Sequence, residues 1–130
     1  MHIQIAAVGK IKEKYLADGI AEYAKRLRPY VKFDILEVPD EKAPETMSPA
    51  EEAQAREREG ERLLALIKPD ALVIALTLDG ELWTSEQLAA RLDEHGTYGS
   101  GHAVFVIGGS TGLSPAVLRR AKHRLSFGRM

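Results

Sequence analysis

The stretch "HAVFVIGGSTGLSP", residues 102–115, joins a near-continuous apolar run to two adjacent glycines and a helix start. We expect a strand over 102–109, because such a run is typical of a parallel strand covered on both faces. Ser114 predicts the N-terminal cap of a helix over 114–123, and Pro115 suits its first position, where a missing N–H costs nothing. A strand, a glycine turn and a helix are therefore predicted in succession.

The same alternation extends over the whole chain. Apolar runs predict strands over 3–9, 31–38, 70–78 and 102–109, with a further strand beginning in 124–130; helical periodicity predicts helices over 13–27, 48–67, 85–95 and 114–123. Ser48 with Glu51, and Thr84 with Gln87, have the spacing of capping boxes. This order predicts an α/β fold, a mostly parallel sheet with helices on both faces, in one domain over 1–130.

Composition excludes several classes of protein. The chain is 45% hydrophobic and 28% charged, with a net charge of −1 and no cysteine, so disulfides and thiolate metal sites are ruled out. The four histidines lack metal-ligand spacing, and we expect no metal. The N-terminal segment does not have the pattern of a signal peptide, and no apolar run is long enough to cross a bilayer. We expect a soluble, cytoplasmic protein without a membrane partner.

Charge is distributed unevenly along the sequence. Residues 1–33 hold seven Lys or Arg against three Asp or Glu, residues 34–94 hold six against sixteen, and residues 95–130 hold five against none. If the two ends meet, they could form a basic face for a phosphate backbone. Solvated helix faces are the alternative. The candidate RNA-binding residues are Lys10, Lys12, Lys14, Arg119 and Arg120.

The glycine loop leaves two interpretations open. Its spacing fits neither a P-loop nor the dinucleotide fingerprint. Adjacent glycines indicate either a tight turn or close approach by a backbone or a ligand. Ligands of parallel sheets bind beyond the carboxyl ends of the strands, which places the relevant loops after Leu76, Ile107 and Phe127. Asp79 could be catalytic, but it stands in an Asp-Gly pair, which is common in turns, and we interpret it as a turn residue. No pattern of catalytic residues stands out.

Four longer stretches together resemble one bacterial family, that of ribosomal RNA large subunit methyltransferase H in the SPOUT superfamily. These stretches are "AVGKIKEKY" at 7–15, "EVPDEKAPETMS" at 37–48, "IGGSTGLS" at 107–114 and "LSFGRM" at 125–130. The resemblance extends along the whole chain. It implies a SPOUT-like fold with a trefoil knot, a homodimer, S-adenosylmethionine as cofactor, and methylation of N3 of a pseudouridine in large-subunit ribosomal RNA.

The resemblance also implies a cofactor site. Leu76 would contact the adenosine part, Gly108 and Gly109 would let the backbone approach the cofactor, and Phe127, Gly128, Arg129 and Met130 would begin the third cofactor loop. No catalytic residue is assigned.

The family pattern continues after "LSFGRM" with a further loop, a helix and a terminal segment. Since these are absent from the 130 residues, we expect an incomplete knot, an uncertain dimer, weak cofactor binding and little activity. Two alternatives remain open. One is a non-catalytic RNA- or ribosome-binding module, and the other is a flavodoxin-like nucleotide-binding domain whose glycine loop holds a phosphate.

Overall fold

The structure, a computed structural model, describes residues 2–9, 18, 22, 32–41, 47–98, 101–109 and 112–126. Within these residues the elements follow one another as β1 (His2–Val8), β2 (Lys32–Val38), α2 (Pro49–Leu66), β3 (Leu72–Leu82), α3 (Ser85–Tyr98), β4 (His102–Ile107), α4 (Pro115–Arg120) and β5 (His123–Ser126). Of the helix predicted over 13–27, only Asp18 and Glu22 are described, and both are helical.

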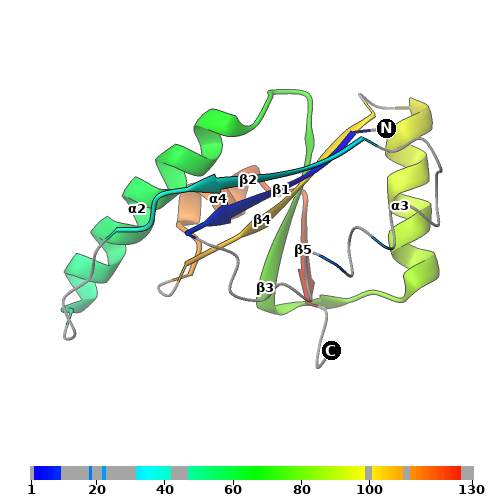
Figure 1. The fold of residues 1–130 in the computed structure, drawn as a ribbon. Helices are drawn as coiled ribbons and strands as arrows, with labels where there is room; N and C mark the ends of the chain where they lie inside the picture. The colour runs from blue at the N-terminus through cyan, green and yellow to red at the C-terminus, as the bar shows by residue number, and fades with distance from the viewer. Residues whose placement is uncertain are drawn as a thin grey trace.

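The strands form one five-stranded sheet in the order β2-β1-β4-β3-β5. Every pair of neighbouring strands is parallel, as the α/β pattern predicts. Figure 1 shows α2 and α4 lying together, with α3 apart from them. Because the strands run in one direction, their carboxyl ends share one edge of the sheet.

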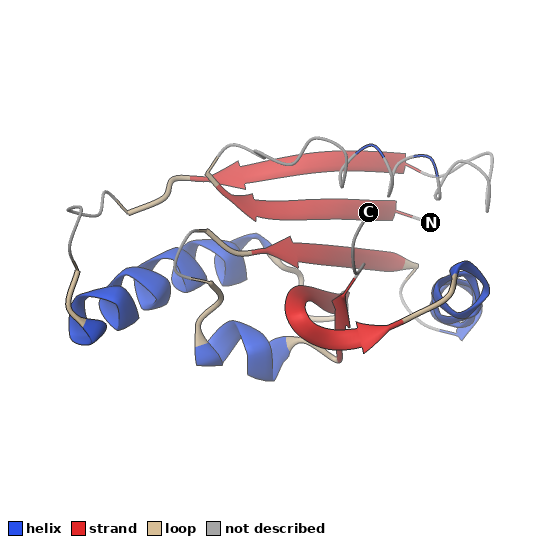
Figure 2. Cartoon of the chain, turned by 90° about the horizontal axis from the view of Figure 1, so that it is seen from below, coloured by secondary structure: helices blue, strands red, loops and turns tan. Residues whose placement is uncertain are grey.

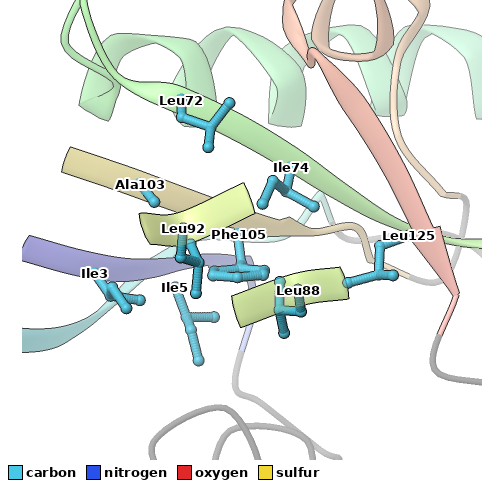
Figure 3. Close-up of a cluster of buried hydrophobic side chains, with 9 residues drawn as sticks. All are labelled: Ile3, Ile5, Leu72, Ile74, Leu88, Leu92, Ala103, Phe105 and Leu125. Atoms are coloured by element: carbon cyan, nitrogen blue, oxygen red, sulfur yellow. The ribbon is translucent and has the colours of Figure 1, made fainter. Parts of the chain in front are cut away.

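Alternate residues of each strand pack on opposite faces of the sheet. On one face, Phe105 of β4 packs with Leu88 and Leu92 of α3 in a cluster completed by Ile3, Ile5, Leu72, Ile74, Ala103 and Leu125 (Figure 3). The side chains between them face the other way, and this second cluster includes Val104 and Val106 of β4, Val73 of β3, Leu63 of α2 and Val117 of α4. Burying each large apolar side chain stabilises the fold by roughly 1.5–3 kcal/mol. The helices therefore cover both faces, as predicted.

Helix starts follow the predicted caps. The Ser48 hydroxyl accepts a hydrogen bond from the Glu51 N–H at 3.2 Å, and the Glu51 carboxylate accepts one from the Ser48 N–H at 3.3 Å. Thr84 and Gln87 make the same reciprocal pair at 3.1 and 2.8 Å. Ser114 Oγ accepts from the Val117 N–H at 3.3 Å. These bonds satisfy N–H groups that the helix itself leaves without a partner.

The Asp79–Gly80 pair is not the end of a strand, and the predicted turn there is wrong. β3 continues to Leu82, and Leu125 of β5 lies opposite Leu76 and again opposite Glu81 (Figure 2 shows the strand curling). Residues 77–80 thus form a bulge. An added Cβ at Gly80 would lie 2.7–2.8 Å from backbone atoms of Arg124 and Leu125. Close approach of β5 is what requires glycine here.

Other boundaries also differ from those predicted. The helix predicted over 114–123 ends at Arg120, and His123 begins β5. α3 runs through Gly96 to Tyr98, and β4 ends at Ile107, before the two glycines. Helix and strand ends are set by contacts with neighbouring segments as well as by local preference, so such shifts of a few residues are expected.

Gly80→Ala tests the bulge. The methyl group would collide with the β5 backbone, so we expect the free energy of unfolding to fall by about 1–3 kcal/mol. Asp79→Ala is the control: its side chain is exposed, so the free energy of unfolding should change by less than about 0.5 kcal/mol. Urea unfolding measures both. An Asp79 effect as large as that of Gly80 would instead support the tight turn.

Candidate cofactor edge of the sheet

Three predicted cofactor segments begin at one level of the sheet. Leu76 of β3 pairs with Ile107 of β4 on one side and with Leu125 of β5 on the other. Gly108 follows Ile107 directly, and the pairing of β3 with β4 ends at Leu76 and Ile107, so the bulge after Leu76 and the glycine loop after β4 both begin at this level. Phe127, Gly128, Arg129 and Met130 follow β5 and lie outside the described residues. We refer to Leu76 with the bulge that follows it in β3, and to the ends of β4 and β5, as the cofactor edge.

The glycine loop folds back on itself. The Gly112 N–H donates to the Gly109 carbonyl at 3.0 Å, and these residues form an isolated antiparallel bridge. An added Cβ at Gly108 would lie 2.8 Å from the Gly112 carbonyl carbon. The tight-turn interpretation therefore accounts for the bare backbone at Gly108, which the resemblance attributed to room for a cofactor. A cofactor contact at Gly108 stays a prediction.

A carboxylate lies beneath the loop. Glu59 of α2 is buried, and an added Cβ at Gly109 would lie 3.4 and 3.5 Å from its two oxygens. Its Oε2 accepts a hydrogen bond from the Glu41 N–H at 2.9 Å. Its Oε1 is buried without a hydrogen-bond partner in the part of the chain that the structure describes.

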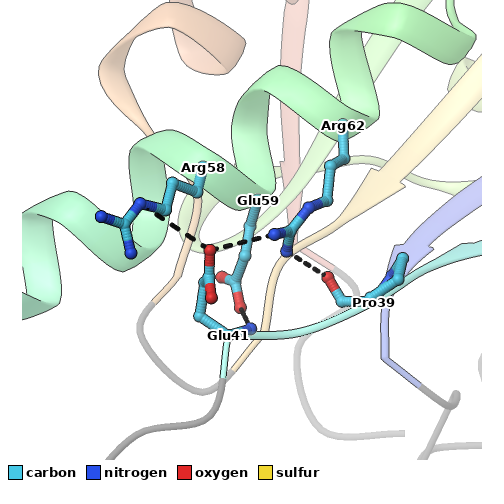
Figure 4. A network of polar contacts seen from close by, with 5 residues as sticks. All are labelled: Pro39, Glu41, Arg58, Glu59 and Arg62. Atoms are coloured by element: carbon cyan, nitrogen blue, oxygen red, sulfur yellow. Dashed lines mark hydrogen bonds and ion pairs between the residues drawn. The ribbon is translucent and has the colours of Figure 1, made fainter.

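The segment 39–41, which follows β2, is bound to α2 by further contacts (Figure 4). Arg62 donates to the Glu41 carboxylate at 3.0 Å and to the Pro39 carbonyl at 2.8 Å, and Arg58 lies 3.9 Å from the same carboxylate. Because the Arg62 guanidinium donates to both a carboxylate and a backbone carbonyl, it holds the segment 39–41 in one orientation against α2.

Sequence reasoning missed two polar groups near this edge. Thr77 directly follows Leu76, and its hydroxyl is buried without a partner among the described residues. Glu59 was hidden in a highly charged helix. Its spacing was the available signal, since Ala55, Glu59 and Leu63 follow one another at intervals of four and all are buried.

The candidate RNA-binding residues have different positions. Arg120 donates to the carbonyls of Lys68, Pro69 and Ala71 at 3.0–3.1 Å, so its guanidinium fastens α4 to the start of β3. Arg119 is exposed. Lys10, Lys12 and Lys14 lie outside the described residues. Arg119 therefore remains available for RNA, whereas Arg120 has a role within the fold.

A second polar cluster lies between α3 and β5. Trp83 packs edge-on against His123 with ring centroids 5.0 Å apart, and Arg91 lies 5.6 Å from the centre of the Trp83 ring. The indole N–H donates to Glu81 at 3.0 Å. Burial, together with the charges of Arg91 and Lys122, lowers the pKa of His123 below its ordinary value of 6.5. Trp83 thus has packing partners within the fold.

Within the described ranges, no group of three His, Cys, Asp or Glu side chains could hold a metal ion. Of the helices that the structure describes, none is both long and apolar enough to span a membrane.

An α/β domain with a parallel sheet and a glycine loop at the carboxyl edge fits many nucleotide-binding classes, and comparison with known proteins selects one. Over residues 1–130 the chain matches the family described as "Predicted SPOUT methyltransferase". The chain belongs to this family, so its chemistry is methyl transfer from a methyl-donor cofactor. This confirms the resemblance and removes the flavodoxin-like alternative.

The similar proteins share one name, ribosomal RNA large subunit methyltransferase H. That of Listeria monocytogenes serovar 1/2a is 59% identical over 130 residues, which are 100% of this chain and 82% of the relative. That of Ligilactobacillus salivarius is 58% identical over 129 residues, covering 99% of this chain and 81% of the relative. That of Bacillus pumilus is 55% identical over 130 residues, with coverage of 100% and 82%.

His123 makes the stability of the fold depend on pH. Its pKa is lower in the folded state, so near pH 6.5 the unfolded chain takes up a proton that the folded chain does not, and stability falls on acidification. We expect His123→Gln to remove this loss. The difference in free energy of unfolding between the unsubstituted chain and His123→Gln should therefore shift in favour of His123→Gln as the pH falls from about 7.5 to about 5.5. Urea unfolding across this range measures it; parallel profiles would contradict the assignment.

Proposed function

We propose that this chain transfers the methyl group of S-adenosylmethionine to N3 of a pseudouridine in large-subunit ribosomal RNA. The observation that supports this most directly is the shared level of Leu76, Ile107 and Leu125, because each expected cofactor segment begins at one of these residues or within two residues of it in the sequence. Family membership supplies the reaction class, and the names of the relatives suggest the RNA substrate.

The residues present suit such a cofactor. Leu76, Gly108 and Gly109, with Phe127, Gly128, Arg129 and Met130, would surround it. The buried Thr77 hydroxyl, which lacks a described partner, adds a hydrogen-bonding group beside Leu76. The cofactor brings an already activated methyl group, so the protein needs to supply position more than chemical activation.

Positioning is therefore the main task of this chain. Methyl transfer needs the donor and the base nitrogen in line at near-attack distance, and holding them there can contribute a large part of the rate. The glycine loop is suited to this task because its own Gly112–Gly109 hydrogen bond already fixes the ends of the turn. Less backbone freedom then has to be lost when a ligand binds.

The RNA side of the site rests on charge. Lys10, Lys12, Lys14 and the exposed Arg119 are the candidate contacts to the phosphate backbone. An unpaired base can be turned out of its stack into a pocket at a moderate cost, which suits chemistry on a ring nitrogen. The trefoil knot and the homodimer, which the resemblance implies, remain predictions.

Gly108→Ala tests the cofactor edge. The added methyl would push against the Gly112 carbonyl and displace the loop, so we expect the affinity for S-adenosylmethionine and kcat/KM to fall about tenfold or more. Gly101→Ala is the matched control. Gly101 precedes β4 at the opposite end and has a φ of +73° with open space around it, so alanine should cost about 1 kcal/mol of stability without changing cofactor affinity.

The assay uses ribosomal RNA lacking the modification, with isotopically labelled cofactor and mass spectrometry of the nucleosides. Because low activity is expected, the product is accumulated before detection. Methyl transfer to pseudouridine N3 supports the proposal. Salt-dependent RNA binding without methyl transfer would contradict it in favour of the non-catalytic module.

A further inference from the structure

Glu59 lies between two segments that are far apart in the sequence. On one side its Oε2 holds the Glu41 N–H at 2.9 Å. On the other side both oxygens lie close to Gly109, whose added Cβ would be only 3.4 Å from Oε1. The side chain is 4% exposed. Among the described residues, one N–H donates to this carboxylate. Burying a carboxylate with so few donors is unfavourable for folding, so its position calls for a reason other than stability.

The next residue of α2 contacts the other end of the same loop. An added Cβ at Gly60 would lie 2.3 Å from the Ser114 hydroxyl oxygen and 3.3 Å from a methyl carbon of Val117. Ser114 caps α4, which follows the glycine loop directly. Glycine inside a helix normally weakens it, and here its missing side chain lets α2 and the start of α4 approach closely.

We propose that Glu59 and Gly60 are positioning residues, which together hold the two ends of the glycine loop, Gly109 and Ser114, at the cofactor edge. Neither residue need touch the cofactor. They act through the loop, whose ends they fix relative to α2 and to the segment 39–41. The link to cofactor binding rests on the proposed function, whereas the link to the loop does not.

The neighbouring glutamates of the helix provide the contrast. Glu57 and Glu61 are exposed. They are separated from the loop by the turn of the helix, because residues two apart on a helix do not face the same side. A carboxylate at 59 therefore has a use that the carboxylates at 57 and 61 do not share.

The first measurement is amide hydrogen exchange of Gly112, whose N–H donates to the Gly109 carbonyl. Glu59→Asp shortens the side chain, so its carboxylate cannot hold Glu41 and support Gly109 together. We expect exchange at Gly112 to become about tenfold faster while the amides of β1 and β4 keep their protection. Glu59→Gln keeps the length and the acceptor for the Glu41 N–H and should restore protection to within about threefold. Glu57→Asp, the same change at an exposed site, should have no effect.

The second measurement is cofactor binding by titration. Glu59→Asp should weaken the affinity for S-adenosylmethionine about fivefold or more, with the affinity for RNA unchanged and with rescue by Glu59→Gln. Gly60→Ala approaches the loop from its other end and should give the same two results. If the unsubstituted chain does not bind S-adenosylmethionine, the proposed function fails, but the exchange at Gly112 still decides the role of Glu59.

Several outcomes would overturn the proposal. Unchanged exchange at Gly112 in both Glu59→Asp and Gly60→Ala is one. Faster exchange that is equal across the whole sheet is another, because it would mean a general loss of stability. If Glu59→Asp does not fold, Gly60→Ala carries the test. If neither folds, the pair supports the whole fold rather than the loop, and the proposal is wrong.

Discussion

The pairing of β3 with both of its neighbours is the constraint on which the rest of the structure depends. Leu76 lies opposite Ile107 and Leu125, and this register is fixed because alternate residues of β3 and β4 are buried on opposite faces of the sheet. A slip by one residue would exchange the two faces, so that Ile74 and Phe105 would face α2 and α4 in place of α3. The same apolar packing that stabilises the sheet therefore aligns the ends of its strands.

Helix α2 relates this edge to the rest of the molecule. It contributes Leu63 to the core, Arg62 to the segment that follows β2, and Glu59 and Gly60 to the two ends of the glycine loop. These contacts come from adjacent turns of one helix, so α2 connects the glycine loop with the segment 39–41. A site that must place a methyl group to within a fraction of an ångström benefits from such a support.

What could be predicted from the sequence is what depends on neighbouring residues. The helix caps and the alternation of strands and helices depend on residues close together in the sequence. The structure confirms the caps at Ser48, Thr84 and Ser114 and the parallel sheet that the alternation predicts. The Asp79–Gly80 pair looked like a turn because the approach of β5, which makes it a bulge, involves residues more than forty positions away.

The candidate site was predictable only in part, for the same reason. The shared level of Leu76 and Ile107 follows from a general rule for parallel sheets. The neighbour that requires glycine at position 108 is the backbone of Gly112, which no spacing pattern indicates. The three carbonyls that accept hydrogen bonds from Arg120 lie about fifty residues away in the sequence, so these contacts could not be predicted from it either.

In most strands the number of residues and the pairing register depend on each other, and the bulge in β3 makes them independent. Since Leu125 lies opposite both Leu76 and Glu81, the ladder resumes at the same rung where it stopped. Residues 77–80 can therefore gain or lose a residue without shifting the pairing on either side. Variation in length among related chains should be tolerated there, next to Leu76, while the paired halves of the strand stay unchanged.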